Sequence, residues 1–178
     1  MATTFTSVGG RSGEPLLLGS LCSRAGSIST AEMEHLHRLV AVWQLLADLS
    51  FADLLLLAPM RRQPDRDLLV LAQTRPDTAQ TLYPEDHVGT ALLRENASEA
   101  QLALETGQPH RGAADERGVQ RVAVPVRVED RVPAVLFSEG IPYGGRRVSG
   151  VEEAYSRAAD SLYSMILEGV FPFPGMQD

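Results

Sequence analysis

The chain has 178 residues, 44% of them hydrophobic and 22% charged, and a chain of this length buries roughly two-thirds of its unfolded surface, enough for one core. All 16 basic residues are arginine and 23 residues are acidic, so the formal net charge is −7. This balance disfavours a nucleic-acid-binding protein, which needs a basic face. Without lysine, the chain also lacks a P-loop nucleotide cradle and a Schiff-base nucleophile.

Cys22 is the one cysteine, so the chain holds neither an internal disulfide nor a cysteine-based zinc site. Its longest apolar run is far shorter than the ~20 residues that cross a bilayer, and we expect a cytoplasmic protein without membrane contact. Residues 1–28 are rich in glycine, serine and threonine and are expected to be a disordered leader. The folded domain is expected over residues 29–169, and residues 170–178 are expected to begin a linker to a further domain.

The first long helix is expected to begin after Ser29, because Ser29 and Glu32 match a capping box and apolar residues recur at helical spacing up to Ser50. Residues 54–57 are all leucine, as in a strand that is covered on both faces. Together with a second apolar run over residues 68–73, they predict an antiparallel hairpin.

Residues 74–93 show no sustained period and are expected to form a structured loop. A short helix should follow, opened by the capping sequence Asn-Ala-Ser-Glu at Asn96, running through Glu105 and terminated by Gly107 and Pro109. The apolar alternation over residues 121–128 predicts a strand, which should pair back with residues 132–137 as a second hairpin.

A final helix is expected to be capped by Ser149 and to stop at Gly169. The element order is therefore helix, hairpin, loop with a small helix, hairpin, helix. Strands joined by tight turns form an antiparallel sheet, and two long amphipathic helices must bury their apolar sides against it or against copies of themselves. This pattern predicts an α+β fold.

Three parts of the chain together resemble a known family: residues 42–53, residues 72–78 with 86–90, and residues 152–172. They are similar to the N-terminal GAF-like sensor domain of cytosolic two-component histidine kinases from high-GC Gram-positive bacteria. The resemblance implies a GAF-like antiparallel sheet of five or six strands, with the long N- and C-terminal helices packed on one face. It also implies a downstream PAS domain and kinase core, with a cognate response regulator as partner.

The chain itself is not expected to be an enzyme. Such kinases place a phospho-acceptor histidine shortly before a Lys-Asn pair, whereas this chain has no lysine and no glycine motifs of an ATP lid. Some GAF domains reduce methionine sulfoxide, but that chemistry needs positioned cysteines, which Cys22 alone does not supply. We therefore expect a sensor fragment whose full-length parent is a protein-histidine kinase.

A polar cluster in the loop over residues 74–93 is the predicted ligand site. Arg75 is expected to meet an anionic group while neighbouring hydroxyls orient it, which suits a cyclic nucleotide or another small anion. The alternative is that these side chains make local turns and ion pairs. No metal site is predicted. The predicted ligand-binding residues are Arg75, Thr78, Thr81, Tyr83 and His87, with His110 and Arg111 on the other side of the same pocket.

Both long helices carry narrow apolar seams, which predict a homodimer held together by a helix bundle. Two functions are compatible with this arrangement. In the first, a ligand shifts the two helices and the shift passes to the downstream kinase. In the second, the domain binds no ligand and is a dimerisation and spacer module of the same kinase. Trp43 and Tyr155 are expected to pack the terminal helices against each other. The residues predicted to form the dimer interface or the helix-bundle interface are Leu36, Val40, Trp43, Tyr155, Leu162 and Met165.

Overall fold

The computed structural model describes residues 5–6, 18–61, 67–141 and 149–173. The helices are α1 (Leu18–Cys22), α2 (Thr30–Ser50), the short 3-10 helix η1 (Arg94–Asn96), α3 (Ser98–Thr106) and α4 (Gly150–Leu167). The strands are β1 (Phe5–Thr6), β2 (Asp53–Pro59), β3 (Asp67–Thr74), β4 (Ala91–Leu93), β5 (His110–Arg111), β6 (Gln120–Val128) and β7 (Arg131–Gly140).

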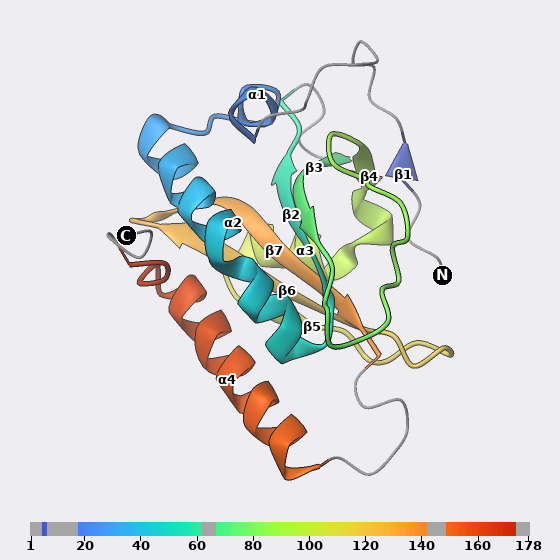
Figure 1. Cartoon of the computed structure of the whole chain (residues 1–178). Helices are drawn as coiled ribbons and strands as arrows, with labels where there is room; N and C mark the ends of the chain where they lie inside the picture. Colours follow the sequence, from blue (N-terminus) through green and yellow to red (C-terminus); the bar gives the residue numbers. More distant parts are fainter. Residues whose placement is uncertain (1–4, 7–17, 62–66, 142–148, 174–178) are drawn as a thin grey trace.

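Within the described residues, the strands form one antiparallel sheet in the order β1-β4-β3-β2-β7-β6-β5. The long helices α2 and α4 lie side by side across one face of this sheet, and α3 covers the other face (Figure 1). The predicted α+β architecture is confirmed. The sheet is wider than expected because the two-residue strands β1 and β5 extend its two edges.

Helix α2 begins where the sequence predicts. The Ser29 hydroxyl accepts a hydrogen bond from the Glu32 backbone N–H at 3.2 Å, and the Glu32 carboxylate accepts one from the Ser29 N–H at 2.6 Å. This capping box satisfies backbone N–H groups that a helix start leaves unpaired. At the other end, Phe51 adopts a left-handed φ of 53° and turns the chain into β2.

Strand β2 lies between β3 and β7 and is buried on both faces. Because successive side chains of a strand point to opposite faces, Leu54 and Leu56 belong to the core under α2 and α4, whereas Leu55 and Leu57 belong to the core under α3. Two hydrophobic cores, one on each side of the sheet, therefore explain the uninterrupted leucine run.

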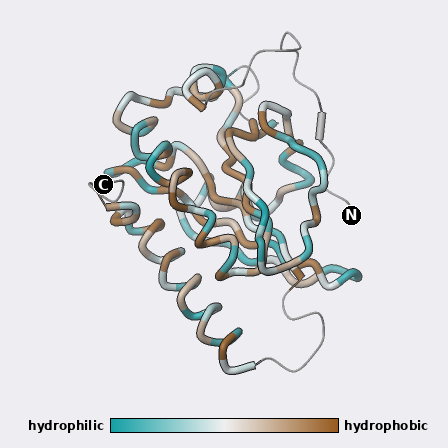
Figure 2. The backbone as a smooth tube through the Cα atoms, in the orientation of Figure 1, coloured by the Kyte–Doolittle hydropathy of each residue, from teal (hydrophilic) through white to brown (hydrophobic). Residues whose placement is uncertain are grey.

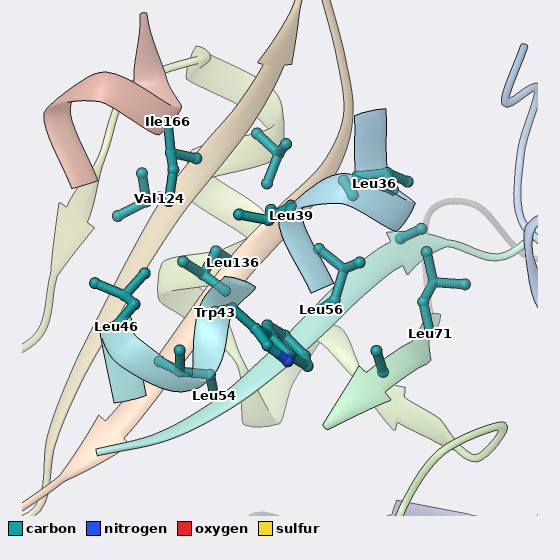
Figure 3. Close-up of a cluster of buried hydrophobic side chains, with 14 of the residues drawn as sticks. Leu36, Leu39, Trp43, Leu46, Leu54, Leu56, Leu71, Val124, Leu136 and Ile166 are labelled. Carbon is teal, nitrogen blue, oxygen red and sulfur yellow. The ribbon is translucent and has the colours of Figure 1, made fainter. Parts of the chain in front are cut away.

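The larger core lies between the sheet and the two long helices (Figure 3). Trp43 of α2 lies over β2 beside Leu54 and Leu56, and Ile166 of α4 lies near Val124 of β6. Each such side chain contributes about 1.5–3 kcal/mol when it is fully buried. These contacts fix both helices on the sheet.

Two of the predicted interface residues are buried in this core. Leu36 is fully buried and Trp43 is 4% exposed, so neither side chain is available to a second chain. The sequence could not show whether these residues pack within the chain or against a second chain. An apolar seam at helical spacing has the same pattern whether it faces a sheet or another helix. A dimer role stays a prediction for the remaining, half-buried or exposed, members of the set, which are Val40, Tyr155, Leu162 and Met165.

Helix α4 has the predicted limits. Ser149 caps it in a capping box, and the chain turns away at Gly169, whose φ is 73°. Its buried residues are Ala159, Tyr163 and Ile166, which recur at steps of four and three. Figure 2 shows the corresponding alternation of hydrophobic and hydrophilic residues along the helix. One side of α4 therefore faces the sheet along its C-terminal half.

Helix α3 is present, but it begins differently from the prediction. Its N-cap is Ala97, which makes no side-chain capping bond, and Asn96 instead ends the short helix η1. The predicted stop is confirmed, since Gly107 adopts a left-handed φ of 64° at the end of α3.

Part of the predicted disordered leader is ordered. Helix α1 contacts α2 and β3, with Leu21 fully buried and Cys22 4% exposed, and β1 pairs with β4. Burial raises the pKa of the Cys22 thiol, which disfavours the reactive thiolate. The segment is ordered because its apolar residues reach the core, a contact that local composition does not reveal. Residues 1–4 and 7–17 of this leader lie outside the described residues.

The predicted linker begins later than expected. Phe171 is 2% exposed and belongs to the larger core, and its N–H donates to the Met165 carbonyl at 3.2 Å. The chain therefore folds back on α4 before it leaves the domain. Residues 174–178 lie outside the described residues.

Candidate ligand-binding site

The loop after β3 is held together by Arg75. Its Nε donates to the Tyr83 carbonyl and its Nη2 to the Glu85 carbonyl, both at 2.6 Å. A guanidinium that donates to two backbone carbonyls satisfies groups that a loop leaves unpaired. The described contacts of Arg75 thus stabilise its own loop.

Two threonines attach the same loop to its surroundings. The Thr78 hydroxyl donates to the Asp48 carbonyl at 2.7 Å, and the Thr81 hydroxyl donates to the Asp53 carboxylate at 2.6 Å. Asp53 is 1% exposed and also accepts from the Leu82 N–H at 2.6 Å. These bonds join the loop to the end of α2 and the start of β2.

The two remaining predicted residues of this loop pack against each other. Tyr83 is 7% exposed and lies in the core under α3, and its ring meets that of His87 edge to face at 5.5 Å between centroids. Burial is the main reason that the pKa of His87 lies below its usual value. All five predicted residues of this loop therefore make contacts within the chain, and a ligand role for them stays a prediction.

The structure does not bring His110 and Arg111 to that loop. Both lie on β5, which β2, β7 and β6 separate from β3. At about 4.8 Å between neighbouring strands, β3 and β5 are about 19 Å apart. The two side chains also diverge, because the His110 ring bonds to Thr106 of α3 at 2.9 Å while Arg111 pairs with Asp160 of α4 at 3.3 Å. The single pocket expected from the sequence is not formed by these seven residues.

A groove between α4 and the sheet is lined by a second cluster of polar groups. It consists of a cavity of about 220 Å³ and an adjoining one of about 270 Å³, which share Arg111, Val122, Asp160 and Tyr163. We call it the α4 groove. Its other polar lining residues are Ser50, His110, Gln120, Ser138, Ser156 and Ser164.

An ion pair crosses the mouth of the α4 groove. Arg111 Nη2 lies 3.3 Å from Asp160 Oδ1, with the two side chains 52% and 62% exposed, and Arg111 Nη1 donates to Gln120 Oε1 at 3.1 Å. An exposed pair of this kind contributes at most about 1 kcal/mol. It can therefore open at low energetic cost and leave both charged groups available.

The inner end of the α4 groove holds a buried hydroxyl without a hydrogen bond. Tyr163 is 8% exposed, and within the described residues its hydroxyl makes no hydrogen bond, although the hydroxyls of Ser50 and Ser138 lie near it. Burial raises the pKa of the Tyr163 phenol, so the group stays protonated. Leaving a buried hydroxyl unsatisfied costs about 1–3 kcal/mol. A ligand atom or a shift of α4 that supplies a partner would recover this energy.

The sequence analysis missed Tyr163, Asp160 and Ser138. One signal was present: Ser138 follows an apolar strand, and Tyr163 falls at helical spacing between Ala159 and Ile166, so both are polar groups at positions that face a core. What the sequence lacked was the pairing of α4 with β5, which brings Arg111 to Asp160 across 49 positions.

Comparison with known proteins identifies the fold. The profile of a family described as the GAF domain of the histidine kinase PdtaS matches residues 18–159. The chain belongs to this family of GAF domains. The match begins at α1, inside the segment that the sequence analysis assigned to a leader, and so agrees with the order seen there.

Relatives of the PdtaS GAF family give the same result over most of the chain. Sensor histidine kinase PdtaS from Mycolicibacterium smegmatis is 35% identical over 87% of the chain, and PdtaS from Mycobacterium tuberculosis is 37% identical over 89%. A solved structure described as the sensor region of a sensor histidine kinase superposes with a TM-score of 0.72 at 34% identity, covering 88% of this chain and 55% of that one. The chain spans about a third of the length of the curated relatives it matches, 32% in each.

These findings confirm the predicted family and fold. The chain is a GAF sensor domain that is homologous to the sensor region of PdtaS, with an antiparallel sheet and both long helices on one face. Among the described helices, none combines the length and the hydropathy that a membrane crossing requires. The described residues also contain no group of three or more His, Cys, Asp or Glu side chains placed to hold a metal ion.

Proposed function

We propose that this GAF domain is the signal-input module of a cytoplasmic histidine kinase and that it responds to a small ligand in the α4 groove. The observation that supports this function is the double role of α4. The helix forms one wall of the groove through Asp160 and Tyr163, and it is also the last described helix before the chain leaves the domain. A ligand that changes the position of α4 therefore acts on the segment nearest to any downstream domain.

Such a relay needs two positions of α4 with different affinities for the ligand. A coupling of about 1–3 kcal/mol is typical between two linked sites. The C-terminal end of α4 is held by Arg127, whose Nε donates to the Leu167 carbonyl at 3.1 Å, and by the return of Phe171 into the core. The exposed Arg111–Asp160 pair is weaker than these attachments, so α4 should move more easily at the groove than at its end.

The kinase activity is a property that we propose for the complete natural protein, with a downstream kinase core and a cognate response regulator as partners. The relatives of this chain are sensor histidine kinases, and the chain matches the GAF domain of PdtaS and the sensor region of a sensor histidine kinase. With ATP labelled at the γ-phosphate, the complete protein should become labelled on histidine and pass the label to its response regulator. The isolated chain should stay unlabelled under the same conditions. A complete protein without any histidine label would contradict the proposal.

A second proposal, which is compatible with the first, is that the domain is a homodimer through its long helices. The observation that favours it is the exposure of large hydrophobic side chains on both: Leu45 of α2 is 55% exposed and Tyr155 of α4 is 40% exposed. Contiguous exposed apolar patches mark interaction surfaces, and the two helices that carry these side chains contact each other.

The Leu45→Glu variant is expected to convert a dimer of the isolated chain into a monomer, because a charge at an apolar interface loses its hydration without gaining a partner. Light scattering at micromolar concentration measures the molar mass. Leu102→Glu is the matched control, since Leu102 is 43% exposed on α3, on the other face of the sheet. A wild-type chain that is monomeric at this concentration would contradict the dimer.

A further inference from the structure

The charges that line the cavity of about 220 Å³ in the α4 groove are one positive and one negative. Arg111 comes from β5 and Asp160 from α4, 3.3 Å apart, and the other described side chains around this cavity are uncharged. A ligand with only an anionic group would take Arg111 from Asp160 and leave that carboxylate close to a second negative charge. A ligand with only a cationic group would take Asp160 from Arg111 and leave that guanidinium close to a second positive charge.

A ligand that carries both charges replaces both members of the pair. A carboxylate accepts two parallel hydrogen bonds from a guanidinium, and an ammonium group donates to a carboxylate such as Asp160. Arg111 and Asp160 then keep charged partners when the ion pair between them opens. The arrangement favours a ligand with a carboxylate and an ammonium group within a few bonds of each other.

The inner end of the groove favours a neutral polar group on the same ligand. Tyr163 offers a buried hydroxyl that lacks a hydrogen bond, and Ser50 and Ser138 add hydroxyls beside it, with no charged group among them. The Ser50 hydroxyl already donates to the Leu46 carbonyl at 2.7 Å, so it remains available as an acceptor. The two adjoining cavities, of about 220 and 270 Å³, are each smaller than the ~300–1,000 Å³ of sites for drug-sized molecules, which favours a small metabolite.

We infer that the α4 groove binds a small zwitterion of the amino-acid type, with its carboxylate on Arg111, its ammonium group on Asp160 and a neutral hydrogen-bonding side chain directed toward Tyr163. The inference rests on the proposed function and adds the ligand class. Because Asp160 and Tyr163 both belong to α4, the ligand contacts the signalling helix at two points one turn apart. A ligand that forms a hydrogen bond with the Tyr163 hydroxyl binds more tightly to one of the two positions of α4 and so favours that position.

Titration calorimetry of the chain with L-threonine, L-asparagine and L-glutamine tests the ligand class. Butyrate supplies the carboxylate alone, butylamine the ammonium group alone, and cyclic AMP a phosphate on a nucleoside. At least one of the amino acids should bind, and butyrate and butylamine should bind about tenfold more weakly or not at all. Binding of butyrate or cyclic AMP as tight as that of every amino acid would overturn the zwitterion in favour of an anion site, and no binding of any amino acid would also overturn it.

Three variants locate the binding. Arg111→Gln should weaken amino-acid binding about tenfold or more, because the ligand carboxylate loses its charged hydrogen-bond donor. Arg111 is exposed, so the substitution should not disturb the core. Tyr163→Phe should weaken it several-fold and abolish the preference for a polar side chain. Arg157→Gln is the matched control on α4, since the Arg157 side chain is 73% exposed and pairs with Glu153 on the same helix.

Thermal unfolding of each variant shows whether it is folded. If Tyr163→Phe is not folded, Arg111→Gln on the surface still decides the question. Unchanged amino-acid binding in a folded Arg111→Gln variant would overturn the inference. The proposed function is tested separately by histidine labelling of the complete protein, so a labelled kinase whose domain ignores amino acids contradicts the inference alone.

Discussion

Replacing Trp43 with alanine is expected to lower the free energy of unfolding by about 3–5 kcal/mol. Trp43 is 4% exposed and lies between α2 and β2, beside Leu54 and Leu56 (Figure 3). Its removal takes the largest side chain out of the layer that holds α2 on the sheet and leaves a cavity. Equilibrium unfolding in urea measures the change, with circular dichroism as the signal because Trp43 is the one tryptophan.

Leu102→Ala is the control for this experiment. Leu102 is 43% exposed on α3, on the other face of the sheet from the proposed dimer interface, so its truncation should change the free energy of unfolding by no more than about 0.5 kcal/mol. The comparison separates the loss of a buried side chain from the loss of an exposed one. If Trp43→Ala left the unfolding free energy intact and instead reduced the molar mass, Trp43 would lie between two chains and the core described here would be wrong.

Replacing Arg121 with methionine is expected to destabilise the domain by about 3–5 kcal/mol, the range for breaking one side of a buried ion pair. Arg121 Nε donates to Glu139 Oε1 at 2.6 Å, and the two side chains are 14% and 2% exposed. The pair joins β6 to β7, where Arg121 and Glu139 are direct neighbours in register. Without the guanidinium, the Glu139 carboxylate remains buried without its ion-pair partner. Urea unfolding at neutral pH measures the loss.

Two further variants identify the cause of that loss. The double variant Arg121→Met, Glu139→Leu also removes the buried carboxylate and should recover most of the stability. Asp115, which lies 3.7 Å from Arg121, keeps its ion pair with Arg117 at 3.6 Å in this variant. Arg157→Met removes one side of an exposed pair with Glu153, whose side chains are 73% and 62% exposed, and should cost less than about 1 kcal/mol. If the double variant were as unstable as Arg121→Met, the aliphatic packing of Arg121, and not its charge, would account for its contribution to the free energy of unfolding.

Local signals in the sequence predicted the helices and strands well. These signals depend on interactions within a few residues, so they can be recognised without knowledge of the fold. They are the capping boxes at Ser29 and Ser149, the leucine run of β2 and the glycine stop at Gly169. The sequence analysis wrongly assigned α1 to a disordered leader and Phe171 to a linker, because neither segment carries a strong local signal. Their order comes from burial against distant parts of the chain.

The ligand site shows the same limit more sharply. Arg75, an arginine in a polar loop, was predicted to bind an anionic group of a ligand. In the structure its guanidinium donates to the backbone carbonyls of Tyr83 and Glu85. Arg111 was included as a candidate for the wrong pocket, since it lies on the far edge of the sheet and pairs with Asp160. Strand order and the rotation of each helix decide which polar groups face one another. The spacing of residues along the chain predicts neither of them.

The sequence by itself determined the family, the α+β class, the order of the elements and where most of them begin and end, because caps, turns and hydrophobic periods act over short stretches of chain. Only the tertiary structure decided that the Leu36–Trp43 seam faces a sheet, that the two ends of the domain extend further, and that Arg111, Asp160 and Tyr163 meet in one groove. These are contacts between residues far apart in the chain, and their free energy exists only once the sheet has assembled and the helices have packed on it.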